Sequence, residues 1–133
     1  MNNEIAIVVP SCDKYSDLWE PFFENLRAKW PDNPYKIYLI SNHANFEMHN
    51  ISVIKVGVDI TWSANLKKAL QSINEKTIFL LIDDLFFKES IDNKGLTYLC
   101  SRFNSEKMNY LRFNPTPGPS GPLDKDGIGA IPQ

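Results

Sequence analysis

Short runs of consecutive apolar residues alternate along this chain with segments in which apolar residues recur every three or four positions. The runs predict buried strands of a parallel sheet, and the spaced segments predict amphipathic helices that cover it. The expected strands are Ile5–Val9, Lys36–Ile40, Ile51–Val56, Thr77–Ile82 and, more weakly, Tyr110–Phe113. Their order predicts an α/β fold, with a mostly parallel open sheet and flanking helices.

Three helices are expected between or after these strands, each beginning beside a side chain that can accept a hydrogen bond from a free backbone amide. The expected caps are Ser16 or Asp17 for the first helix, Thr61 for the second, and Ser90 or Asp92 for the third. The first helix is expected to stop at Pro31–Pro34, and the second to run from Trp62 to Ile73.

The composition changes after residue 113. From Asn114 onward the chain is rich in proline and glycine, and such a segment cannot form a regular element. We therefore expect two parts. Residues 1–113 form a ligand-binding α/β domain, and residues 114–133 form a loop or tail that packs poorly by itself.

Charge and hydropathy limit the partners. The formal net charge of −2 provides no general positive field for nucleic acid or for an anionic membrane. The first apolar run is too short for a signal peptide, and no stretch approaches the roughly 20 apolar residues of a membrane span. Cys12 and Cys100 have no metal or redox spacing and fit reduced thiols, although one disulfide stays open. We expect a cytoplasmic protein that binds no nucleic acid.

The strand expected at Thr77–Ile82 runs directly into two carboxylates, Asp83 and Asp84. Its apolar run predicts burial on both faces, and the acids are expected where the strand leaves the sheet, because acids are costly to bury in mid-strand. Ligands bind at this carboxyl edge of an open parallel sheet. Adjacent carboxylates there can hold a divalent cation, and the cation can hold a diphosphate. The alternative is that one acid caps the following turn and the other is solvated.

Further segments are expected at the same edge, and their hydroxyls, amides and rings suit a nucleotide. In the first loop, Tyr15 can stack on a base and Asp13 can accept a hydrogen bond from it. Trp62 and Asn65 lie in the first turn of the second expected helix, and the free backbone amides at a helix start favour a phosphate. Both segments also have a purely structural interpretation: an ordinary turn, and a capped amphipathic helix that buries Trp62 in the core.

Several catalytic motifs are absent from the sequence. It contains no G-x-G-x-x-G, P-loop, H-E-x-x-H or G-x-S-x-G, so dinucleotide oxidoreductases, P-loop NTPases and hydrolases lose support. No histidine has a recognisable spacing to Cys12 that would make the thiol a nucleophile. A receiver-type signalling domain is disfavoured because no lysine follows the fifth expected strand.

Four segments resemble the nucleotide-sugar glycosyltransferases of the GT-A fold, a Rossmann-like α/β fold, and above all bacterial enzymes that build surface polysaccharide. They are IAIVVPSCDKY at the first strand, YLISN at the second, TWSANLKKAL at the second helix and FLLIDDLFF at the fourth strand. The last is similar to the Asp-x-Asp metal motif of that family, with Ile82 in place of its first acid. The resemblance covers roughly residues 4–113.

This resemblance implies a nucleotide-diphosphate sugar as donor, a saccharide acceptor and a divalent cation, Mn²⁺ or Mg²⁺. It implies that Asp84 holds the cation with Asp83 beside it, and that Asn65 lies near the donor phosphate or sugar. Base contacts are implied for the Ser11–Tyr15 loop and Asn42. The residues expected to bind the nucleotide sugar are therefore Ser11, Asp13, Tyr15, Asn42, Trp62, Asn65 and Asp83.

The chain is shorter than members of that family, whose second half supplies the acceptor site and the catalytic base. We therefore expect an apparently truncated, donor-binding half, and we assign no catalytic residue. The alternative is a non-catalytic module of the same fold that acts in protein–protein interaction, for example as a homodimer, through exposed residues such as Phe86 and Phe87.

Overall fold

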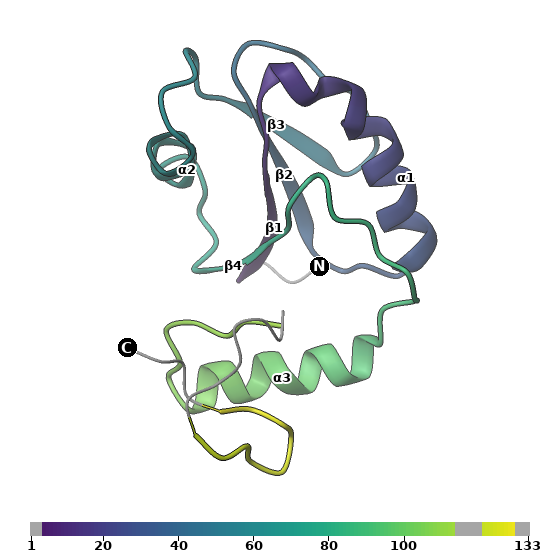
Figure 1. The fold of residues 1–133 in the computed structure, drawn as a ribbon, viewed down its shortest axis with the longest axis vertical. Helices are drawn as coiled ribbons and strands as arrows, with labels where there is room; N and C mark the ends of the chain where they lie inside the picture. Colours follow the sequence, from purple (N-terminus) through teal and green to yellow (C-terminus); the bar gives the residue numbers. More distant parts are fainter. Residues whose placement is uncertain (1–3, 114–120, 130–133) are drawn as a thin grey trace. The chain divides into compact units, whose positions relative to one another are not determined.

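The structure, a computed structural model, describes residues 4–113 and 121–129 (Figure 1). The chain divides into two compact units, residues 1–93 and 94–133, and each is described by itself. The change of composition at Asn114 falls within the second unit. Among the described residues, no helix combines the length and the apolar character that crossing a membrane requires.

The first unit is built on a four-stranded parallel sheet. Its strands are β1 (Ile5–Pro10), β2 (Lys36–Ser41), β3 (Ile51–Lys55) and β4 (Thr77–Leu80), in the spatial order β3-β2-β1-β4. The predicted α/β class and parallel open sheet are confirmed. Since β1 pairs with β2 on one side and β4 on the other, the loops that follow these strands meet at one edge of the sheet.

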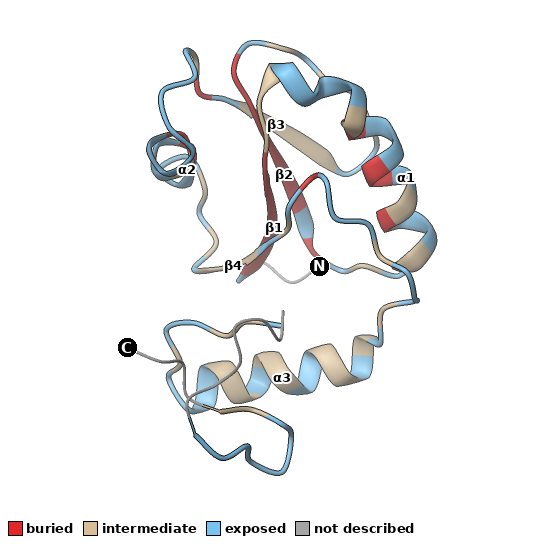
Figure 2. Ribbon diagram, in the orientation of Figure 1, coloured by how far each residue is buried: buried red, intermediate tan, exposed pale blue. Residues whose placement is uncertain are grey.

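The sheet is covered by one helix on each face. Figure 1 shows α1 (Trp19–Lys29) and α2 (Trp62–Leu70) on opposite sides of it. Side chains alternate between the faces of a strand, so Ala6 and Val8 of β1 join the core cluster that includes Ala69 of α2. Figure 2 shows the buried positions concentrated in β1, β2 and one side of α1.

The start of the first helix differs from the prediction. Neither Ser16 nor Asp17 caps it, because both lie inside a 3₁₀ helix, η1 (Asp13–Leu18), that leads into α1. The N-cap of α1 is Leu18, and it makes no side-chain cap hydrogen bond. Ser16 and Asp17, which the sequence pattern assigns to a cap, instead belong to this tighter helix that precedes α1.

The second helix begins as predicted and ends earlier. The Oγ1 atom of Thr61 accepts a hydrogen bond from the backbone N of Ala64 at 3.1 Å, which confirms the expected cap. The helix ends at Leu70 and does not continue to Ile73. The third helix, α3 (Asn93–Ser105), begins directly after Asp92, one of its two expected caps.

The prediction that the fourth strand is buried on both faces is wrong. β4 is an edge strand whose residues are at most half-buried, and Leu80 is 41% exposed. It also ends at Leu80, two residues before the expected end at Ile82. The fifth strand expected at Tyr110–Phe113 does not form, so within the described residues no strand pairs with the outer edge of β4.

The second unit contains an ion cluster around Arg102 of α3. Its guanidinium contacts Glu106 at 2.5 Å, Asp124 at 2.8 Å and Asp126 at 2.6 Å. Hydrogen bonds from Arg102, and then from the backbone amides of Ile128 and Asp126, lower the pKa of Asp124 to about 2. The described part of the proline- and glycine-rich segment, residues 121–129, is thereby connected to α3. Residues 114–120 and 130–133 lie outside the described part of the chain.

Candidate functional site

A cavity of about 300 Å³ opens at the carboxyl edge of β1. The loop after β1, the start of α2 and the residues after β4 all contribute to its lining. Its polar and aromatic lining residues are Ser11, Tyr15, Asp59, Trp62, Asn65 and Asp83. The rest of the lining is apolar apart from the thiol of Cys12. A concave, partly apolar site with a few polar groups is typical of small-molecule binding.

The cavity brings together five of the seven residues predicted to bind a nucleotide sugar. These five are Ser11, Tyr15, Trp62, Asn65 and Asp83. The remaining two, Asp13 and Asn42, do not line it, and neither does Asp84. Ligands bind where parallel strands end, and most of the residues chosen by this rule lie together in the structure.

The sheet register explains how Ser11 meets Asp83. Val8 of β1 pairs with Leu80 of β4, and the next rung is retained because the backbone N of Leu81 donates to the carbonyl of Val8 at 3.0 Å. Continuing the same register places Ser11 opposite Asp83. The Oγ of Ser11 donates a hydrogen bond of 2.5 Å to Oδ2 of Asp83.

Ser11 also accepts a hydrogen bond, from the core helix. The indole Nε1 of Trp19 donates to the Oγ of Ser11 at 2.7 Å. Because the indole can only donate, it directs the Ser11 hydroxyl proton toward the carboxylate. A buried tryptophan of α1 thus orients Ser11, and Ser11 orients Asp83. The sequence alone does not identify Trp19 as part of the site, because the helical spacing of this residue indicates only a core position.

Asp83 is a buried carboxylate without a cationic neighbour. It is 8% exposed, and within the described residues no lysine, arginine or histidine forms an ion pair with it. Burying an ionised carboxylate is costly unless it is paired or hydrogen-bonded. Of the two expected acids, Asp84 is exposed in the turn after β4 and matches the solvated alternative, whereas Asp83 turns inward.

Asp13 and Asn42 connect the loops around the cavity. The Asp13 carboxylate accepts hydrogen bonds from the backbone N of Asn42, His43 and Ala44, at 2.9 to 3.2 Å. In return, Oδ1 of Asn42 accepts from the backbone N of Asp13 at 2.9 Å, and its Nδ2 donates to the carbonyl of Gly57 at 2.9 Å. The two side chains thereby fix the loops after β1, β2 and β3. Their predicted contacts with a base stay a prediction.

These hydrogen bonds change the acidity of Asp13. Burial raises its pKa, but the backbone amides of His43, Ala44 and Asn42 favour the ionised carboxylate more strongly, so the net pKa lies below the ordinary value. Gly57 lies at φ +82°, a left-handed conformation that glycine adopts without strain. The loop closure therefore depends on an ionised Asp13 and on a glycine after β3.

The start of α2 also lines the cavity. Trp62, its first residue, is 54% exposed, so the alternative that it is a core anchor is wrong. Asn65 is buried, and its Nδ2 donates to Oδ1 of Asp59 at 2.7 Å. Asp59 was missed by the sequence analysis. An acid just before a helix cap is a signal that could have found it, since the helix dipole favours negative charge there.

The lining carries negative charge only. Two carboxylates, Asp59 and Asp83, line the cavity, and no lysine or arginine does. Lys68 of α2 instead donates to the carbonyl of Val56 at 2.7 Å. In the described part of the chain, no group of three or more histidine, cysteine or acidic residues could hold a metal ion. Mg²⁺ often uses only one or two carboxylates together with substrate phosphates. The predicted role of Asp84 as a metal ligand therefore stays a prediction.

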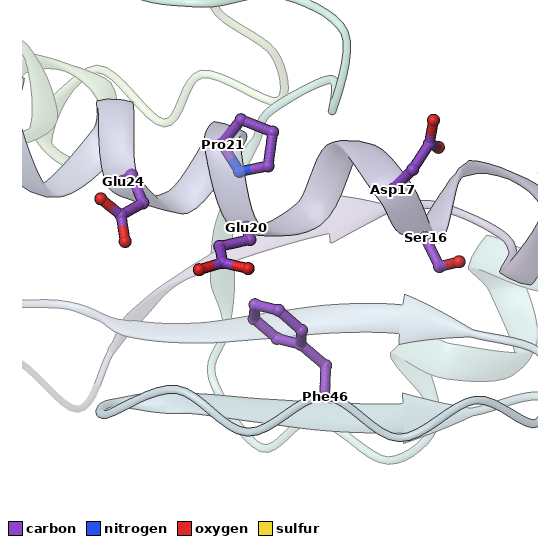
Figure 3. Close-up of a pocket in the computed structure, with 6 residues that line it drawn as sticks. All are labelled: Ser16, Asp17, Glu20, Pro21, Glu24 and Phe46. Carbon is purple, nitrogen blue, oxygen red and sulfur yellow. The ribbon is translucent and has the colours of Figure 1, made fainter.

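A second, wider hollow lies along α1 (Figure 3). It has a volume of about 740 Å³ and is lined by Ser16, Asp17, Glu20, Pro21, Glu24 and Phe46. Figure 3 shows the ring of Phe46 facing Glu20. Phe46 is half-buried and packs against the core, because its ring lies 5.8 Å from Trp19 and 5.6 Å from Phe23. None of the predicted binding residues lines this hollow, so the cavity beside β1 is the candidate site.

Comparison with models of protein families, with curated proteins and with solved structures finds no match to this chain.

Proposed function

We propose that this protein binds a nucleotide-diphosphate sugar in the cavity beside β1 and is the donor-binding part of a glycosyltransferase. The transferred sugar would enter bacterial surface polysaccharide, as the resemblance of the four sequence segments implies. The observation that supports this best is the convergence of Ser11, Tyr15, Trp62, Asn65 and Asp83 on one cavity.

The lining offers partners for each part of such a donor. The exposed rings of Tyr15 and Trp62 can stack on a base, which is favourable for any base because every base has a π-face. The amides of Asn65 and the carboxylate of Asp83 suit ribose or sugar hydroxyls. The cavity volume of about 300 Å³ is at the small end of ligand sites, which span roughly 300–1,000 Å³. Part of the donor would therefore extend beyond it.

A diphosphate in this cavity requires a cation. Its lining carries two carboxylates and no basic side chain, so an uncompensated diphosphate would be repelled. Asp84, with Asp83 beside it, is the candidate to hold Mn²⁺ or Mg²⁺. Bound there, the ion would supply charge neutralisation for the leaving diphosphate. The role of this chain would be to hold the donor and to exclude water from its buried side.

Thermal unfolding with UDP or GDP tests the proposal. With Mn²⁺ present we expect one of these nucleotides to raise the Tm, because a ligand at a hundred times its Kd stabilises a folded protein by about 2.7 kcal/mol. Asp84→Asn should abolish the part of the shift that depends on Mn²⁺. Glu20→Gln, which removes an exposed carboxylate of the other hollow, should leave the shift unchanged. If no nucleoside diphosphate moves the Tm with or without Mn²⁺, the proposal is wrong.

A non-catalytic interaction module is the second candidate. Leu80, Ile82, Leu85 and Phe86 are exposed along the end of β4 and the segment after it, and contiguous apolar surface marks interaction sites. Phe86 is exposed as expected, but the expectation for Phe87 is wrong: it is half-buried, and two hydrogen bonds with the Asn25 side chain, at 2.8 and 3.1 Å, hold its backbone. Sedimentation over a range of concentrations would support this candidate by showing a dimer that Leu85→Asp dissociates. A monomer at all concentrations would count against the homodimer.

A further inference from the structure

The cavity beside β1 carries two negative charges and no positive one. Asp59 and Asp83 line it, and no described lysine or arginine does. The Asp59 carboxylate already has a neutral partner, since Nδ2 of Asn65 donates to it at 2.7 Å. Asp83 is the more deeply buried of the two, at 8% exposure. A ligand that brings a positive charge would relieve the cost of burying this carboxylate.

Asp83 presents one oxygen to the protein and leaves the other for a ligand. Its Oδ2 accepts the 2.5 Å hydrogen bond from Ser11, which Trp19 orients from behind. Within the described residues, Oδ1 makes no hydrogen bond. Because no buried side-chain oxygen or nitrogen among these residues lacks a partner, Oδ1 is open to solvent. The side chain lines the cavity, so Oδ1 is the atom that a bound group can reach from it.

Two aromatic rings line the same cavity. Tyr15 and Trp62 are 48% and 54% exposed, so neither ring is consumed by the core. The faces of such rings attract ammonium groups, and cages of aromatic rings recognise quaternary ammonium ligands. A carboxylate beside the rings adds a Coulomb attraction. A phosphate finds no comparable partner, because the lining contains no cationic side chain.

We propose that this cavity takes an organic ammonium group, held by the Asp83 carboxylate with the rings of Tyr15 and Trp62 beside it. In a nucleotide-sugar donor this group would be an unacylated amine of the sugar, and that identity rests on the proposed function. The rings of Tyr15 and Trp62 would then contact the sugar, and the base would lie in the part of the donor that extends beyond the cavity. The preference for a cation rests only on the charges and rings of the cavity.

The direct test compares two ligands that differ only in charge. Choline and the neutral alcohol in which carbon replaces its quaternary nitrogen are titrated into the full chain, and amide and indole NMR shifts are followed. We expect choline to shift the Trp62 indole and the Ser11 amide, and to bind about tenfold more tightly than the neutral alcohol. Equal binding of the two, or no shift at these residues with choline, would overturn the inference.

Matched variants separate the carboxylate from general surface charge. Asp83→Asn keeps the volume and the acceptor for Ser11 but removes the charge, so choline binding should weaken about tenfold. Asp17→Asn removes the same charge from an exposed site outside the cavity and should leave binding unchanged. Tyr15→Phe should retain binding, and Tyr15→Leu should weaken it. The spectrum of each variant without ligand shows whether it is folded. A folded Asp83→Asn protein that binds choline normally would refute the proposal.

A third titration, with UDP-glucose and Mg²⁺, separates this inference from the proposed function. Binding of UDP-glucose without any preference for choline over its neutral analogue would leave a nucleotide-sugar site and refute the ammonium site. Binding of choline without any binding of nucleotide sugars would support an ammonium site and remove the proposed donor. Binding of neither would refute both.

Discussion

Ser11 links the core to the candidate site. It accepts from the indole of Trp19 at 2.7 Å and donates to Asp83 at 2.5 Å, so one hydroxyl serves as a partner for both side chains. Losing one partner of a buried polar group typically costs about 1–3 kcal/mol. The site and the stability of the first unit are therefore coupled through one hydroxyl.

Ser11→Ala should accordingly lower the free energy of unfolding by about 1–3 kcal/mol, because it leaves the Trp19 indole and the Asp83 carboxylate without this partner. Denaturant unfolding, followed by tryptophan fluorescence, measures the change. Trp19→Phe removes the indole donor, and the double variant should be less destabilised than the sum of the two single variants. Additive effects would show that Trp19 does not act through Ser11.

Asp13 makes the loop closure depend on pH. Its folded-state pKa is lowered below the ordinary 3.8, so its ionised form stabilises the fold. This contribution is fully present above the ordinary pKa and is lost as the pH falls through the folded-state pKa. All three tryptophans, Trp19, Trp30 and Trp62, lie in the first unit and report on it separately from the acids of the second unit.

Asp13→Asn should therefore destabilise the first unit at neutral pH and flatten its loss of stability in acid. Tryptophan fluorescence in denaturant, recorded from pH 7 down to about pH 3, gives both quantities. The difference between the wild-type protein and the variant should shrink as the pH falls below about 4. A constant difference over the whole range would contradict the role given to the carboxylate. Asp17→Asn, at an exposed carboxylate, is the matched control.

At the scale of the elements, α2 both covers the sheet and forms one wall of the cavity. Its start is fixed by Thr61, whose hydroxyl accepts from the backbone N of Ala64 at 3.1 Å. Trp62 and Asn65 lie within the first turn, so their positions in the cavity depend on where the helix begins.

Thr61→Ala should cost about 1 kcal/mol of unfolding free energy, because an amide of the first turn loses its cap. Ligand affinity should fall as well, since the first turn carries two lining residues. Thr61→Ser retains the hydroxyl and should retain both properties. Chemical unfolding and a ligand titration measure them. If the alanine variant lost stability and kept full affinity, the start of α2 would not be part of the binding site.

The elements show which local signals predict structure. Short apolar runs predicted all four strands, although Ser52 interrupts the third, and the Thr61 cap predicted the start of α2, because both signals act within a few residues. The 3₁₀ helix before α1 was not predicted, since Asp13 binds amides of a loop that follows another strand. The exposed edge position of β4 was not predicted either. An apolar run does not specify which strand, if any, lies beside it.

At the scale of the whole molecule, topology creates the site. All four strands are parallel, so the segments that follow them lie at one edge of the sheet. This rule predicted five of the lining residues from sequence, namely Ser11, Tyr15, Trp62, Asn65 and Asp83. It could not predict which side chains turn inward. Asp83 enters the cavity while Asp84 faces solvent, and Asp13 connects loops instead of lining the cavity.

The most direct measurement of the central claim is an amide and indole NMR map of where a nucleotide sugar binds. UDP-glucose and GDP-mannose, each with the diamagnetic cation Mg²⁺, are added to the full chain. We predict that at least one of them shifts the signals of Ser11, Tyr15, Trp62 and Asn65, around the cavity beside β1. Signals of Glu20 and Glu24, in the hollow along α1, should stay in place. Shifts confined to that hollow, or no shifts with either nucleotide sugar, would contradict the account.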